Sequence, residues 1–154
     1  MTLPLHAVPQ RQTEMVAIIR SQGWLLAPSG RKDMATHENI GFKQFDLNAE
    51  IERYSPGVPS GRRSETLIKT PGLRVVLVTM RAGTELHEHV APGPITLQPI
   101  QGRFALILED GEREAAPGTL LTLAGETRHA VRAIEYGAFL LTIGWGGDER
   151  ERNP

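Results

Sequence analysis

Residues 83–102 of the chain read GTELHEHVAPGPITLQPIQG and contain two of its five histidines, His87 and His89, one residue apart. A Pro-Gly-Pro turn follows them, and then an apolar run that ends at Gly102. Side chains at positions i and i+2 of a β-strand point to the same face. The segment therefore predicts a strand that aims two imidazoles into one space, a pattern that suits a first-row metal ion.

The composition indicates one soluble globular domain. The chain has 154 residues, of which 40% are hydrophobic and 23% charged, as is usual for such domains. The net charge is -1 without a basic block, so we expect no nucleic-acid partner. No apolar run is long enough for a membrane span and the N-terminus does not resemble a signal peptide, so we expect a cytoplasmic protein without a membrane partner. The absence of cysteine excludes disulfides and thiolate chemistry.

Short strand patterns separated by turn residues dominate the chain from residue 65 onward. Residues 73–80, LRVVLVTM, are apolar on both faces and predict a strand that is covered on both sides. Asp110-Gly111 predicts a hairpin turn between strands at 104–109 and 112–115. Further strands are expected at residues 65–70, 95–100, 119–123, 131–134 and 139–143. Strands at intervals of roughly eight to twelve residues are typical of an all-β sandwich or barrel.

The first forty residues differ from the remainder. Residues 9–22 place Met15, Val16, Ile18 and Ile19 on one face, which predicts a short helix that starts near Pro9. We expect this helix and an irregular arm over residues 1–40, the β domain over 41–146, and a polar tail over 147–154.

Two short segments at the start of the β domain, residues 42–47 and 51–54, are weak strand patterns and are predicted as strands. His6 and His37 lie in the arm without a spaced histidine partner. We therefore expect both to be solvent-exposed or locally hydrogen-bonded.

Two motifs resemble those of the cupin superfamily. The segment that runs from Gly83 through His87 and His89 to Gly102 resembles the first cupin motif, and residues 118–129, GTLLTLAGETRH, resemble the second. The likeness spans residues 65–143 and is greatest to small, single-domain RmlC-like cupins, a group with many uncharacterised members. It implies a double-stranded β-helix, the jelly-roll cupin barrel, here with a short N-terminal helix. It also implies a homodimer, for which exposed strand edges give a physical reason.

The resemblance implies a metal site inside the barrel, with His87, His89 and His129 as ligands. The cupin carboxylate ligand falls at Ile95 in this chain, which weakens an iron-dependent oxygenase hypothesis. Three imidazoles and a water still suit zinc and related ions, so a divalent ion (iron, zinc, nickel or manganese) is the expected cofactor, although the site can also be metal-free.

Two further side chains are candidates to complete that metal shell. Gln98 offers an amide oxygen, although strand alternation places it opposite Ile95 unless the preceding turn shifts the register. Glu85 shares the parity of His87 and His89, and its other interpretation is a carboxylate at the barrel mouth.

The remaining candidate residues predict a pocket but do not indicate which ligand it binds. Seven apolar residues are expected to line the barrel or pack between the sheets: Leu97, Phe104, Leu106, Leu121, Leu123, Phe139 and Leu141. Arg103, Arg128 and Arg132 are expected either to pair with nearby glutamates or to contact an anionic ligand.

Two functions remain open at this point. The first is a binding or sensing module that holds a divalent metal, a small organic ligand, or both. The alternative is a metal-dependent oxygenase or isomerase acting on a small organic substrate. The missing carboxylate and the absence of an obvious general base favour binding, and the sequence leaves open whether the protein is an enzyme.

Overall fold

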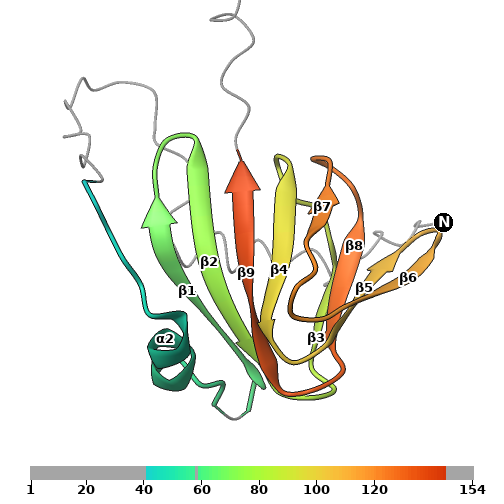
Figure 1. The fold of residues 1–154 in the computed structure, drawn as a ribbon. Helices are drawn as coiled ribbons and strands as arrows, with labels where there is room; N and C mark the ends of the chain where they lie inside the picture. Colours follow the sequence, from blue (N-terminus) through green and yellow to red (C-terminus); the bar gives the residue numbers. More distant parts are fainter. Residues whose placement is uncertain (1–40, 58, 145–154) are drawn as a thin grey trace, which may run out of the picture.

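The computed structural model describes residues 41–57 and 59–144. Within these ranges the chain forms one short helix and nine strands in two antiparallel sheets (Figure 1). The elements are α2 (Leu47–Arg53), β1 (Arg62–Lys69), β2 (Leu73–Met80), β3 (Glu85–His89), β4 (Ile95–Gln101), β5 (Phe104–Leu108), β6 (Gly111–Ala115), β7 (Leu121–Leu123), β8 (His129–Ala133) and β9 (Gly137–Gly144). The predicted all-β fold is confirmed.

The chain passes repeatedly from one sheet to the other. One sheet has the strand order β1-β2-β9-β4-β7 and the other has the order β3-β8-β5-β6. From β6 onward each successive strand lies in the opposite sheet, since β7 and β9 belong to the five-stranded sheet and β8 to the four-stranded one. These crossings tie the two sheets into one sandwich with a shared core, as in jelly rolls.

The core lies between the inner faces of the two sheets. Phe104 of β5 and Phe139 of β9 meet edge to face with ring centroids 5.0 Å apart, and neither is more than 1% exposed. The seven apolar residues predicted to line the barrel all belong to this core or pack against it. Buried side chains alternate along the strands and form one apolar inner face on each sheet. Packing of these two faces shields their side chains from water, which stabilises the sandwich.

Strand β2 is covered on both faces, as its sequence predicts. Val76, Val78 and Met80 point into the main core. Leu77 points to the other face, where it packs with Ile51 of α2. Helix α2 therefore shields part of the outer face of the five-stranded sheet (Figure 1).

The strands predicted at residues 42–47 and 51–54 are wrong, because this region forms α2. The Asp46 side chain caps the helix by accepting hydrogen bonds from the amides of Asn48 and Ala49, at 3.0 and 3.2 Å. Capping and the burial of Ile51 outweigh the weak local strand pattern. In the described ranges no helix is long and apolar enough to cross a membrane. The helix predicted at residues 9–22 and the polar tail lie outside the described residues.

The hairpin between β5 and β6 is confirmed, with its turn one residue earlier than predicted. Leu108 pairs with Gly111, so Glu109 and Asp110 form the turn. Gly111 follows with a φ of 130°, a conformation that glycine adopts without strain. The glycine of the Asp-Gly pair is thus the first residue of the return strand.

The close approach of β9 to the end of β4 yields a stability prediction. A Cβ on Gly137 would overlap the backbone carbonyl of Gln101, which cannot move without disturbing the sheet. We expect Gly137→Ala to destabilise the protein by about 1–3 kcal/mol, as overpacking usually does, and thermal unfolding would show the loss.

Gly72→Ala is the matched control for this substitution, since a Cβ there meets nothing within 4 Å. It should change stability by no more than about 0.5 kcal/mol. Equal destabilisation by both substitutions would show that the contact with Gln101 is not the cause.

Candidate functional site

Two of the predicted site residues, His89 and His129, lie side by side on neighbouring strands. They are direct partners in the β3–β8 pairing, and their ring centroids are 4.3 Å apart with an interplanar angle of 60°. His129 is 3% exposed and lies two residues before the core residue Val131. Both imidazoles therefore face the space between the two sheets.

The histidine pair lies at the end of the sandwich where Ile95, Leu123 and Ile143 adjoin one another, here called the mouth. Two loops hold the pair there. Residues 90–94 connect His89 to Ile95, and residues 124–128 connect Leu123 to His129. The loops contact each other, since the Glu126 amide donates to the Ala91 carbonyl at 2.9 Å.

Each imidazole is oriented by a backbone carbonyl two residues earlier. Nδ1 of His89 lies 2.7 Å from the His87 oxygen, and Nδ1 of His129 lies 2.8 Å from the Thr127 oxygen. A carbonyl can only accept, so Nδ1 carries the proton in both rings and Nε2 is left as an acceptor when the ring is neutral. The same arrangement orients histidines that ligate metals.

Both rings are held in the neutral state. Burial lowers the pKa of His89 to about 4, against the opposing effect of its hydrogen bond to the His87 carbonyl, and the charges of His129 and Arg62 lower it further. Burial also lowers the pKa of His129, while its bond to Thr127 acts in the opposite direction. At neutral pH the pair thus offers two uncharged Nε2 acceptors.

His87 does not join the pair, because strand alternation breaks between Leu86 and His89. Leu86 pairs with Val131 and His89 with His129, so three residues of β3 span the distance that two residues of β8 span. Such a bulge reverses the facing of the residues beyond it. The His87 side chain is 57% exposed, and its Nδ1 lies 3.6 Å from Glu85 Oε1. Glu85 likewise stays with His87, away from the pair.

Gln98 lies on the outer face of the five-stranded sheet. It is exposed, whereas Ile95 and Leu97 on the same strand are buried in the core. Side chains therefore alternate regularly from Ile95 to Gln98, and the turn before β4 does not bring Gln98 to the inner face. Among the residues that the structure describes, no group of three or more His, Asp or Glu side chains is placed to hold a metal ion.

Comparison with known proteins identifies the architecture. No protein-family model and no curated protein matches the chain. A conserved protein of unknown function from Streptococcus pyogenes superposes with a TM-score of 0.60 at 20% identity, over 75% of this chain and 99% of that one. A cupin-2 domain containing protein from Shewanella frigidimarina superposes with a TM-score of 0.56 at 11% identity, over 66% and 94%.

A third solved structure is the cupin domain of an XRE family transcriptional regulator from Enterobacter cloacae, with a TM-score of 0.50 at 18% identity, over 56% and 99% of the two chains. The chain has the cupin fold. At these identities the likeness extends to the fold alone. The two segments that resemble cupin motifs form the two loops and strands that bring His89 and His129 together.

The three arginines singled out from the sequence lie on the outside of this cupin barrel. Arg128 pairs with Glu88 at 3.2 Å and Arg132 with Glu112 at 2.8 Å. Arg103 bridges Glu114 and Glu135 at 2.6 and 2.8 Å. Their predicted pairing with glutamates is confirmed.

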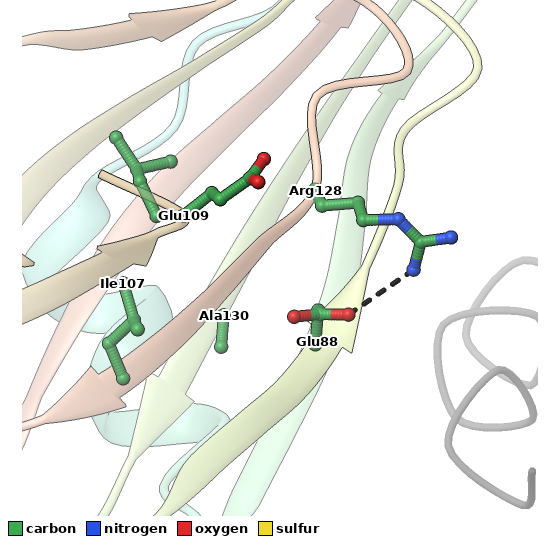
Figure 2. Close-up of a pocket in the computed structure, with 6 residues that line it drawn as sticks. Glu88, Ile107, Glu109, Arg128 and Ala130 are labelled. Atoms are coloured by element: carbon green, nitrogen blue, oxygen red, sulfur yellow. Dashed lines mark hydrogen bonds and ion pairs between the residues drawn. The ribbon is translucent and has the colours of Figure 1, made fainter. Parts of the chain in front are cut away.

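A hollow of about 430 Å³ lies on the outer face of the four-stranded sheet. Figure 2 shows its lining, in which Ile107 and Ala130 form an apolar floor beside the Arg128–Glu88 ion pair. Ala130 follows His129 directly in β8, so the two side chains point to opposite faces of the sheet. The hollow is therefore separate from the histidine pair.

Sequence reasoning missed one buried charge, Arg74 in β2. It is 4% exposed and shares the inner face of β2 with Val76 and Val78. The sequence does contain a feature that indicates this burial, since Arg74 is the one charged residue within the otherwise apolar or uncharged run of residues 73–80.

The lowered pKa of His89 predicts a loss of stability in mild acid. The unfolded chain takes up a proton at His89 near pH 6.5, whereas the folded protein does so only near pH 4. Stability should therefore fall as the pH decreases through this window, by at most about 3 kcal/mol from His89. Urea denaturation with chelator present, between pH 7 and pH 4.5, measures the loss.

His89→Gln should reduce this pH dependence, while His87→Gln, the exposed neighbour, should leave it as in the parent. If His89→Gln retains the full acid loss, burial of the His89 ring does not control stability.

Proposed function

We propose that the chain binds a small organic ligand at the mouth of its cupin barrel, as a binding or sensing module without turnover of its own. The observation that carries the proposal is the histidine pair. Two neutral imidazoles face the barrel interior with Nδ1 held by carbonyls and Nε2 left as acceptor. A concave apolar wall with a few oriented polar groups is the usual form of a small-molecule site.

The surroundings of the pair support an organic ligand. Ile95 and Ile143 at the mouth are core residues, and Leu123 packs against them. An apolar body can bury against these side chains, while a hydroxyl or amine of the ligand donates to Nε2 of His89 or His129.

A divalent metal ion fits this site only in part. The pair supplies two imidazole donors, whereas zinc sites in proteins use three or four protein ligands. The described residues do not provide the three-histidine set that the cupin resemblance implies, so we derive no catalytic step through a metal. Binding of iron, zinc, nickel or manganese by His89 and His129 remains a prediction.

A second candidate function, a metal-dependent oxygenase or isomerase, draws on one observation. Anchoring of Nδ1 by a carbonyl is the arrangement that metal-bound histidines share, and both His89 and His129 have it. The sensing role draws support from elsewhere: a solved cupin domain of similar fold belongs to an XRE family transcriptional regulator.

The chain is also proposed to form a cytoplasmic homodimer. In the part of the chain that the structure describes, β1 and β7 end one sheet and β3 and β6 end the other. Strand edges of this kind favour pairing with a second copy. Light scattering after size exclusion would measure the mass in solution.

The function is tested by comparing three variants. Protein purified without chelator is analysed for metals, and the chelated protein is then screened by thermal shift against Zn²⁺, Ni²⁺ and a panel of small hydroxy and carboxylic acids. We expect at least one organic compound to raise the melting temperature of the parent. His89→Ala and His129→Gln should remove that shift, whereas His87→Ala should retain it, since His87 lies outside the pair.

The outcomes separate the candidates. Absence of any shift, or an equal shift in His89→Ala and His87→Ala, would overturn the proposed site. Stoichiometric metal that is lost in His129→Gln, together with consumption of a substrate, would favour the enzyme.

A further inference from the structure

The hollow on the outer face of the four-stranded sheet is large enough to hold a small molecule. Its volume is about 430 Å³, within the range of roughly 300–1,000 Å³ that small-molecule pockets usually enclose. Its floor follows from the pairing of two outward-facing residues, since Ile107 of β5 is the direct partner of Ala130 in β8. The short side chain of Ala130 leaves open the space above it that a longer side chain would fill.

Charged side chains stand around this apolar floor on two sides. Glu88 of β3 and Arg128 form an ion pair of 3.2 Å on one side. Glu109, the residue that follows β5, lines the other side. Figure 2 shows Ala130 between them, with the Glu109 carboxylate directed toward the side of Glu88 and Arg128. The hollow therefore combines an apolar base with carboxylates at its rim.

The charged groups that line the hollow are two carboxylates and one guanidinium, so their sum is negative. Arg128 neutralises Glu88, whereas the Glu109 carboxylate forms neither a hydrogen bond nor an ion pair with another of the described residues. The wider surroundings are negative as well, because residues 85–135 contain eight acidic side chains and four arginines. The other charged groups of this sheet and its hairpin lie beside one another: Asp110 with Arg113, Glu112 with Arg132, Glu114 and Glu135 with Arg103, and Glu85 with His87.

We propose that this hollow is a second binding site, and that it takes a small organic cation with an apolar body, such as an alkylammonium or arylammonium ion. The apolar body packs on Ile107 and Ala130, and the ammonium group donates hydrogen bonds to the Glu109 carboxylate. The inference goes beyond the proposed function, because Ala130 faces away from the histidine pair and the site needs neither imidazole.

Charge distinguishes a cation from other ligands of the same shape. A neutral alcohol keeps the contact with the floor but loses the charge-assisted hydrogen bond, which is roughly twice as strong as a neutral one. A carboxylate of the same shape meets Glu88 and Glu109, and like charges repel each other. Its attraction to Arg128 is weakened, because Glu88 already neutralises that guanidinium.

The test is a titration of the isotope-labelled full chain, followed by its amide resonances in two-dimensional NMR spectra. The three probes are phenylethylammonium, phenylethanol and phenylpropionate, which share a ring and differ in charge. We expect the ammonium ion to shift the amide resonances of Ile107, Glu109 and Ala130 saturably, and to bind about fivefold more tightly than the alcohol. Phenylpropionate should leave these resonances unchanged.

Four variants test the charge and the floor of the hollow. Glu109→Gln should weaken binding of the ammonium ion about fivefold, and Arg128→Gln, which releases Glu88, should strengthen it. Ala130→Leu should abolish binding, because the longer side chain fills the hollow. Asp110→Asn is the matched control for Glu109→Gln, since it removes a neighbouring carboxylate that does not line the hollow, and it should bind as the parent does. Dispersed spectra confirm that each variant is folded, and the first two variants decide the matter if Ala130→Leu is not.

Each outcome supports the site or overturns it. Absence of saturable shifts, equal affinity for the ammonium ion and the alcohol, or unchanged affinity in Glu109→Gln would overturn the proposal. An equal loss in Asp110→Asn would show attraction to the acidic surface in general instead of a site. If the same resonances shift with protein concentration and not with the ammonium ion, a second copy of the chain occupies the hollow and the ligand proposal fails. Loss of ammonium binding in His129→Gln would contradict the separation of this site from the histidine pair.

Discussion

The burial of two inner sheet faces against each other is the constraint on which the rest of this protein depends. Phe104 and Phe139 join the sheets through an edge-to-face contact, and aliphatic side chains fill the space around them. The connections 90–94 and 124–128 then cross between the sheets at the mouth. Any polar side chain directed inward at that end is held by a packed scaffold, which gives the candidate site its order.

A single bulge in β3 shapes the candidate site. His87 follows the buried Leu86 and faces solvent, and the extra residue turns His89 to the inner face. The carbonyl of His87 accepts the hydrogen bond from Nδ1 of His89. One irregularity thus places the two histidines on opposite faces of β3. The expected set of three histidines would favour a metal ion. The observed pair of neutral acceptors suits hydrogen bonding to an organic molecule.

The distribution of charge separates the inside of the barrel from its outside. The outer arginines are paired with glutamates at the surface, where such pairs add little to stability. Arg74 has its charge inside, in a row that otherwise consists of core residues. Burying a charge costs more free energy than leaving the surface pairs in water, and Arg74 makes further contacts in the folded protein.

Alternation and turn chemistry act over a few neighbouring residues, so the sequence predicted the strands from residue 65 onward, the hairpin and seven residues of the core. The resemblance of two motifs to cupins implied the cupin fold. The sequence also identified His89 and His129. It could not show that residues 47–53 form a helix, since the packing of Ile51 against Leu77 joins distant segments. The facing of His87 and His89 to opposite sides of β3 and the inward place of Arg74 were likewise decided by tertiary structure. A bulge is set by pairing with a partner strand, and the facing of a lone charge depends on which side the second sheet covers.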